Sequence, residues 1–123
     1  MSKKRALVAE DSLLIMVALE SILEDAEIEI AGAAGNLSEA LTLAPTCDAD
    51  VAILDINLGD GMIFPAADIL AARGIPIVFT TGYASERTLL TRYPKAQMIQ
   101  KPYEAAALLK LVAQSLEATA QFG

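Results

Sequence analysis

The sequence predicts an α/β fold in which a five-stranded parallel sheet is covered on both faces by helices. Short runs rich in β-branched and aliphatic residues alternate with longer amphipathic stretches along the whole chain. This alternation is typical of βα units, whose crossovers place helices on both faces of a parallel sheet. The length of 123 residues suits one domain, and no internal repeat or linker divides it. We therefore expect a single domain over residues 1–123, with no effector domain.

Five apolar runs are expected to be strands. Val51–Asp55 is the strongest of them, because four apolar residues end in a single acid. Glu27–Ala33 alternates between apolar and other residues, which predicts a strand with one face closer to solvent. The other three expected strands are Arg5–Ala9, Pro76–Thr80 and Met98–Gln100.

Five stretches between and after these runs are expected to be helices. Ser12–Asp25 carries apolar residues broadly at helical spacing, namely Leu13, Met16, Val17, Leu19 and Leu23. Asn36 followed by Glu39 predicts a capped helix start, and this helix should end near Ala44, before Pro45. The other expected helices are Pro65–Ala72, a short one from Ser85 to before Pro94, and one from near Tyr103 to about Ala118.

Composition excludes several classes of function. The net charge is −7 and no basic stripe is present, so a nucleic-acid partner is not expected. No apolar run approaches the roughly 20 residues that cross a bilayer, so no membrane partner is expected and the chain should be soluble and cytoplasmic. The chain has no histidine, which excludes a Ser-His-Asp triad, and its lone Cys47 has no partner for a disulfide or a zinc site.

Polar residues follow the buried strands at the points where the strands end. Glu10 and Asp11 come after the first strand, Asp55 ends the third, Thr81 follows the fourth, and Lys101 follows the fifth. Carboxyl ends of parallel strands meet at one edge of the sheet, and ligands of such sheets bind there. We therefore expect three acids, a hydroxyl and an ammonium to converge on this edge.

Each of these residues also has an ordinary structural explanation. Asp11 can cap the first helix, and Asp55 can form a turn with the loop that follows it. Thr81 can be a plain strand end, and Lys101 can be a solvated lysine. The placement of all of them on one edge favours the functional interpretation.

Three neighbouring carboxylates repel one another, and a bound cation would neutralise them. Mg²⁺ suits this role because it prefers oxygen ligands and commonly binds one or two carboxylates together with a phosphate. Asp55 can then act as a nucleophile on phosphorus and form an acyl phosphate. Lys101 would neutralise the oxygens of the transferred group, and the Thr81 hydroxyl would donate a hydrogen bond to one of them.

This set of residues, in this order and spacing, resembles the receiver (response-regulator) domain family over nearly the whole chain. The resemblance rests on Glu10-Asp11, on Asp55 after Val-Ala-Ile-Leu, on Thr81, and on Lys101-Pro102. Phe79-Thr80-Thr81-Gly82-Tyr83 and Lys101-Pro102-Tyr103 are similar to stand-alone receivers from alphaproteobacteria, some of which carry a Phe-Ala-Thr-Gly signature. The resemblance implies a flavodoxin-like sheet with strand order 2-1-3-4-5.

The resemblance also implies the chemistry and the partners. Asp11 and Asp55 would ligate Mg²⁺ directly, Glu10 through water, and Asn57 through its main-chain carbonyl. Asp55 would receive the phosphoryl group from a phosphohistidine on a sensor histidine kinase or a phosphotransfer protein in a bacterial phosphorelay. The chain would be a signalling phosphoprotein and not an enzyme, apart from self-phosphorylation from donors and autodephosphorylation. It would be a monomer or a phosphorylation-dependent dimer, with output through an unidentified downstream protein.

The sequence departs from the common family pattern at three places. The loop after Asp55 lacks the frequent Met-Pro, and Thr80-Thr81 replaces the more usual Thr-Ala or Ser-Ala. Met98 stands where an aromatic residue often acts as a switch. Tyr83 and Tyr103 are the candidates to replace it, and a packing role is the alternative for each of them. We expect the segment from Gly82 to Tyr93 to be the element that changes with phosphorylation.

Two rival interpretations remain. A phosphohydrolase of the haloacid dehalogenase type needs a second aspartate two residues after its nucleophile, whereas this chain has Asn57. A receiver-like interaction module that is never phosphorylated would have the same fold, but it would not need Glu10, Asp11, Asp55, Thr81 and Lys101 together.

Overall fold

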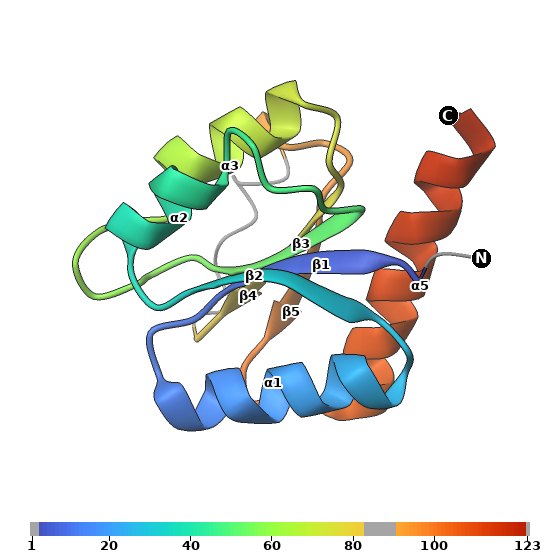
Figure 1. The fold of residues 1–123 in the computed structure, drawn as a ribbon, viewed down its shortest axis with the longest axis horizontal. Helices are drawn as coiled ribbons and strands as arrows, with labels where there is room; N and C mark the ends of the chain where they lie inside the picture. Colours follow the sequence, from blue (N-terminus) through green and yellow to red (C-terminus); the bar gives the residue numbers. More distant parts are fainter. Residues whose placement is uncertain (1–2, 83–90, 123) are drawn as a thin grey trace.

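One parallel sheet forms the centre of the molecule, as predicted. The structure is a computed structural model that describes residues 3–82 and 91–122. The strand order is β2-β1-β3-β4-β5, and Figure 1 shows α1 and α5 against one face and α2 and α3 against the other. The strands are β1 (Arg5–Ala9), β2 (Glu29–Ala34), β3 (Val51–Asp55), β4 (Ile77–Thr81) and β5 (Gln97–Gln100). The helices are α1 (Leu13–Asp25), α2 (Leu37–Leu43), α3 (Phe64–Ala72) and α5 (Ala105–Phe122).

The core is divided into two parts by the sheet. β3 and β4 are buried along their whole length, because helices cover both of their faces. Leu7, Leu54 and Phe79 belong to the part beneath α2 and α3, while Val8, Ile53 and Leu108 belong to the part beneath α1 and α5. Burying these central strands on both sides holds their carboxyl ends in fixed positions, and the polar residues of interest lie at those ends.

Several element boundaries differ from the sequence-based expectation. β2 begins at Glu29 and not at Glu27, because Glu27 adopts a positive φ of 63° in the turn after α1. In this turn the Ile28 N–H donates to the Leu23 carbonyl at 2.8 Å, which ends the helix. β4 is shifted by one residue, and α5 begins at Ala105 instead of Tyr103. Residues 85–90 of the helix expected from Ser85 to before Pro94 lie outside the described residues.

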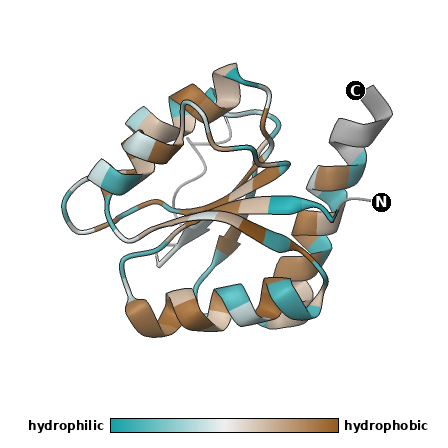
Figure 2. Ribbon diagram, viewed as in Figure 1, coloured by the Kyte–Doolittle hydropathy of each residue, from teal (hydrophilic) through white to brown (hydrophobic). Residues whose placement is uncertain are grey.

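The first turn of α1 exposes large apolar side chains. Leu13 and Leu14 are 77% and 84% exposed, and Val17 on the next turn is 59% exposed. Figure 2 shows the ribbon at the beginning of α1 in brown, the colour of hydrophobic residues. Met16, Leu19 and Leu23 are the buried residues of α1, and Ile22 packs partly buried beside them. Helical spacing alone therefore predicted the helix correctly but not which apolar residues it buries.

A polar and aromatic cluster fastens the chain before β5 to α3. The Tyr93 hydroxyl donates to Asp68 Oδ1 at 2.6 Å, and Arg92 binds Asp68 Oδ2 at 2.6 Å. The Arg92 guanidinium lies over the rings of Tyr93 and Phe64, and Tyr93 packs against Phe79 of β4 with ring centroids 5.2 Å apart. Burial, together with the hydrogen bond to Asp68, raises the pKa of Tyr93.

No helix in residues 3–82 and 91–122 has both the length and the apolar character needed to cross a bilayer.

Candidate functional site

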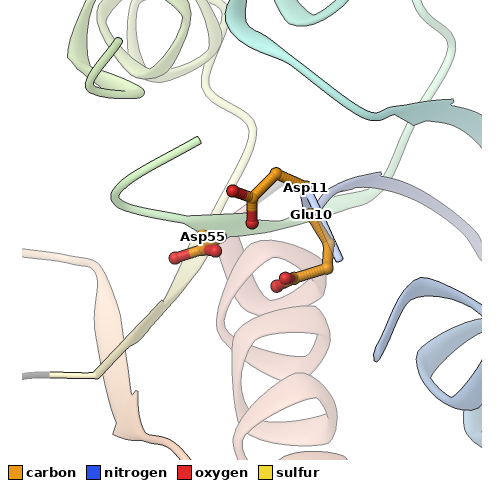
Figure 3. A group of neighbouring side chains, drawn as sticks. All are labelled: Glu10, Asp11 and Asp55. Atoms are coloured by element: carbon orange, nitrogen blue, oxygen red, sulfur yellow. The ribbon is translucent and has the colours of Figure 1, made fainter. Parts of the chain in front are cut away.

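Three carboxylates meet at the carboxyl edge of the sheet, where β1 and β3 end side by side. Glu10 and Asp11 directly follow β1, and Asp55 is the last residue of β3. One oxygen from each carboxylate lies within 4.8 Å of the others. Figure 3 shows the side chains of Asp11 and Asp55 pointing toward one another, with Glu10 beside them. The expected convergence of these acids is therefore present, and we refer to Glu10, Asp11 and Asp55 as the acidic cluster.

Lys101 enters the cluster from the segment that follows β5. Its Nζ donates to Glu10 Oε2 at 2.7 Å and to Asp55 Oδ2 at 2.9 Å. Its main-chain N–H donates to the Thr81 carbonyl at 2.7 Å, which continues the pairing of β5 with β4. The interpretation of Lys101 as a solvated surface lysine is therefore wrong, because its ammonium bridges two buried carboxylates.

Burial and the bridging lysine set the electrostatics of the cluster. Glu10 is 3% exposed and Asp55 is 6% exposed. Burial raises the pKa of Glu10, and the nearby Asp55 charge adds to this, although hydrogen bonds from Lys101 and the Ser12 N–H act in the opposite direction. Burial alone would lower the pKa of Lys101, but its hydrogen bonds to Glu10 and Asp55 outweigh burial and raise it. Lys101 therefore remains charged. Because burial disfavours the charged form of Glu10, a further cation near the cluster would stabilise its carboxylate.

Ser12 caps α1, and Asp11 does not. The Ser12 hydroxyl oxygen accepts a hydrogen bond from the Ile15 N–H at 3.4 Å, at the N-cap position of the helix. The Asp11 carboxylate instead joins the acidic cluster and is exposed to solvent. The capping explanation of Asp11 is therefore wrong, and its carboxylate stands at the solvent side of the cluster.

The loop after β3 reaches the cluster through its backbone. The Asn57 N–H donates to Asp55 Oδ1 at 3.3 Å, so the turn expected after Asp55 is present as well. Asn57 and Met62 face each other in an antiparallel bridge made by the hydrogen bonds Leu58 N to Gly61 O and Ile63 N to Ile56 O. This bridge does not use the Asn57 carbonyl, the group expected to bind metal.

Gly59 is a site residue that sequence reasoning did not single out. Its φ is +84°, and a Cβ at this position would lie 3.3 Å from Asp11 Oδ2. Glycine is therefore favoured here by the backbone conformation, and a larger residue would crowd the Asp11 carboxylate. The signal available in the sequence was the glycine between two turn-forming residues, Asn57 and Asp60.

The remaining predicted residues lie near the site at different depths. Thr81 ends β4 next to β3 and is buried. Met98 pairs with Phe79 and packs against the core beneath α2 and α3, whereas Tyr103 packs partly buried against the core beneath α1 and α5. Burial, with a contribution from the Glu10 charge, raises the pKa of Tyr103. Tyr83 and most of the segment from Gly82 to Tyr93 lie outside the described residues.

Comparison with known proteins identifies the family. The model of the response regulator receiver domain matches residues 6–113. The chain is 34% identical over 114 residues to the transcriptional regulatory protein PdtaR of Mycobacterium tuberculosis, a match that covers 89% of the chain and 55% of that protein. It is 32% identical over 114 residues to the phyllosphere-induced regulator PhyR of Methylorubrum extorquens, with coverages of 89% and 42%. The chain thus spans about half the length of the curated relatives it matches.

A solved structure supports the same assignment. The CheY-like response regulator receiver domain protein from Methanospirillum hungatei superimposes with a TM-score of 0.87 at 27% identity, covering 99% of this chain and 100% of that one. The strand order, the acidic cluster with its lysine, and the match over residues 6–113 agree with one another. This chain belongs to the response regulator receiver domain family of two-component systems.

Proposed function

We propose that this receiver domain takes a phosphoryl group on Asp55, with Mg²⁺ bound in the acidic cluster, and that the modified form presents a changed surface to a partner protein. The observation that carries the proposal is the environment of the Asp55 carboxylate. It is 6% exposed, lies within 4.8 Å of two further carboxylates, and accepts a hydrogen bond from Lys101 at 2.9 Å. An acid held in this way is preorganised to accept an electrophile and a cation together.

The residues at the edge of the sheet fit a magnesium ion. Mg²⁺ binds oxygen ligands, keeps several waters, and takes one or two carboxylates, which matches a cluster made only of carboxylates with one member open to solvent. Asp11 and Asp55 would hold the ion directly, Glu10 through water, and Asn57 through its main-chain carbonyl. The ion would supply positive charge against the oxygens of the incoming phosphoryl group.

The chain's own residues would then carry out the transfer. An Asp55 carboxylate oxygen forms the new bond to phosphorus while the bond from phosphorus to the donor nitrogen breaks, leaving its electron pair on the donor. Lys101, already 2.9 Å from Asp55 Oδ2, would pair with an oxygen of the transferred group. The Thr81 hydroxyl, at the end of the neighbouring strand, would donate to another.

The proposed donor is a protein that carries a phosphohistidine, such as a sensor histidine kinase or a phosphotransfer protein, and it acts in the cytoplasm. The exposed Leu13, Leu14 and Val17 follow the acidic cluster directly along the chain. Exposed apolar groups of this kind mark a surface that a macromolecule covers, and here that surface adjoins the acceptor. The net charge of −7 does not favour direct output through nucleic acid.

Intact-mass measurement with Mg²⁺ and acetyl phosphate, or with a phosphorylated kinase, tests the proposal. The unmodified sequence should gain one phosphoryl group, and Asp55→Asn should gain none. Asp48→Asn, which neutralises an exposed aspartate at the opposite edge of the sheet, should be phosphorylated normally. Chelation of Mg²⁺ should abolish the adduct in the unmodified sequence and in Asp48→Asn.

An adduct of the same yield in Asp55→Asn would show that another residue accepts the group. No adduct from either donor, and no Mg²⁺-dependent change in the amide signals of Asp11 and Asp55, would leave the domain as an interaction module that is never phosphorylated.

A further inference from the structure

The loop that follows Asp55 is a closed hairpin. Besides the Asn57–Met62 bridge, the Asn57 side chain accepts a hydrogen bond from the Gly59 N–H at 3.0 Å. Leu58 inside the hairpin is 2% exposed, so the loop is also anchored in the core. Because the loop is held by its own backbone and by a buried leucine, we expect it to move as one unit.

The tip of this hairpin is fastened to the N-terminus of α2. Asp60 Oδ1 accepts a hydrogen bond from the Leu37 N–H at 2.9 Å, across 23 residues of sequence. Leu37 is the first residue of α2, and its N–H has no partner within the helix. The Gly61 backbone also approaches α2 closely, because a Cβ at Gly61 would lie 2.7 Å from Leu37 Cδ2.

The base of the same hairpin touches the acidic cluster at two points. The Asn57 N–H donates to Asp55 Oδ1 at 3.3 Å. Gly59 lies beside the Asp11 carboxylate, because a Cβ built on Gly59 would be 3.3 Å from Asp11 Oδ2. These two contacts connect the hairpin to the residues that form the acidic cluster.

We propose that Asp60 is a positioning residue of the metal site, which fixes the hairpin and the Asn57 carbonyl by accepting the hydrogen bond from the Leu37 N–H. This inference rests on the proposed binding of Mg²⁺ by the cluster. It has a second consequence, because the coupling between two sites is reciprocal. Binding of Mg²⁺ orders the hairpin, and the ordered hairpin stabilises the first turn of α2 through the hydrogen bond from Leu37 to Asp60. The stability of this turn therefore depends on whether the metal site is occupied.

Charge is the competing explanation, since removal of any carboxylate near the cluster weakens the attraction for a cation. Asp60→Asn and Asp60→Ala separate the two effects. The asparagine variant loses the charge but keeps an oxygen that accepts from the Leu37 N–H, whereas the alanine variant loses both. Asp48→Ala serves as the control for loss of an exposed carboxylate at the opposite edge of the sheet.

Titration calorimetry with MgCl₂ on the full chain measures the affinity of each variant. We expect Asp60→Ala to bind Mg²⁺ about fivefold more weakly, the net effect of one ordinary hydrogen bond in a partly solvated position. Asp60→Asn should stay within about twofold of the unsubstituted chain, and Asp48→Ala should equal it. Hydrogen exchange at the Leu37 amide provides a second readout, and like the calorimetry it does not depend on phosphorylation. Mg²⁺ should slow this exchange in the unsubstituted chain and in Asp60→Asn, but not in Asp60→Ala.

Four outcomes would overturn the inference. Equal losses of affinity in the asparagine and alanine variants would assign the effect to charge. Unchanged affinity in Asp60→Ala, or exchange at Leu37 that ignores Mg²⁺ in the unsubstituted chain, would show that the hairpin and α2 are independent. Failure of the unsubstituted chain to bind Mg²⁺ would overturn the proposed function, and this inference with it, whereas the other outcomes leave the proposed function intact.

Discussion

Replacement of Lys101 by methionine should destabilise the metal-free protein strongly. Methionine approximates the length of the lysine stem but removes the ammonium that lies 2.7 Å from Glu10 Oε2 and 2.9 Å from Asp55 Oδ2. The side chains of Lys101, Glu10 and Asp55 are only 19%, 2% and 8% exposed. Water therefore cannot replace the lost charge, and two carboxylates would be left buried against each other.

Removing one partner of a buried ion pair costs about 3–5 kcal/mol. The lower end applies here, because Glu10 already has a raised pKa and can relieve the repulsion by taking up a proton. A loss of about 3 kcal/mol is a large part of the roughly 5–15 kcal/mol by which a domain of this size is stable. Mg²⁺ should restore part of this loss, since a cation bound only by the folded state stabilises it by about 2.7 kcal/mol at 100 times its Kd.

Urea unfolding at pH 7, with EDTA and then with Mg²⁺, measures these effects. Lys110→Met, at an exposed position of α5, is the matched control and should change the free energy of unfolding by less than about 0.5 kcal/mol. The loss in Lys101→Met should shrink as the pH is lowered, because Glu10, whose pKa is raised by burial, then takes up a proton. A loss below about 1 kcal/mol at pH 7 in EDTA would refute the reasoning, because it would mean that solvent already screens the cluster.

Three further predictions concern single side chains of the site and its surroundings. Because the folded-state pKa of Glu10 lies above its ordinary value of 4.5, the stability that this group contributes is complete below about pH 4.5 and is lost as the pH rises through the raised pKa. In EDTA, urea unfolding across this range should therefore show a smaller decline for Glu10→Gln, and an unchanged slope would contradict the assignment. Gly59→Ala and Gly74→Ala both place a side chain at positive φ and should each lose about 1 kcal/mol, but calorimetry should find weaker Mg²⁺ binding only for Gly59→Ala. Tyr93→Phe should cost about 1 kcal/mol in urea unfolding through the lost hydrogen bond to the half-exposed Asp68, and a neutral result would show that water replaces that bond.

Much of the fold could be predicted from the sequence because the central strands are buried on both faces. Val51–Asp55 has a continuous apolar pattern that only a covered strand needs, and its bounds were predicted without error. The start of β2 could not be predicted, since a glutamate in the left-handed region leaves no local signal. The exposure of Leu13 was equally hidden, because periodicity shows a helix but not which neighbours cover its ends.

The sequence predicted where the residues of the candidate site lie on the sheet, but not which hydrogen bonds they form. The rule that polar residues gather at the carboxyl ends of parallel strands brought Glu10, Asp55 and Lys101 to one edge. The sequence could not decide whether Asp11 or the neighbouring Ser12 caps α1, since both residue types favour that position. The hydrogen bond from Leu37 to Asp60 was missed because aspartate in a glycine-containing loop is ordinarily interpreted as a turn former.

The bridge from Lys101 to Glu10 joins residues 91 positions apart, and its bond to Asp55 spans 46. Such contacts close very long loops of chain, so they are formed late on any folding route in which local structure comes first. Until β5 has joined the sheet, the acids at the ends of β1 and β3 lack their ammonium and repel one another. The charges at this edge are therefore balanced only when the whole domain has folded. A fragment that ends before β5 would contain every acid of the cluster but would lack the Lys101 ammonium that offsets their repulsion.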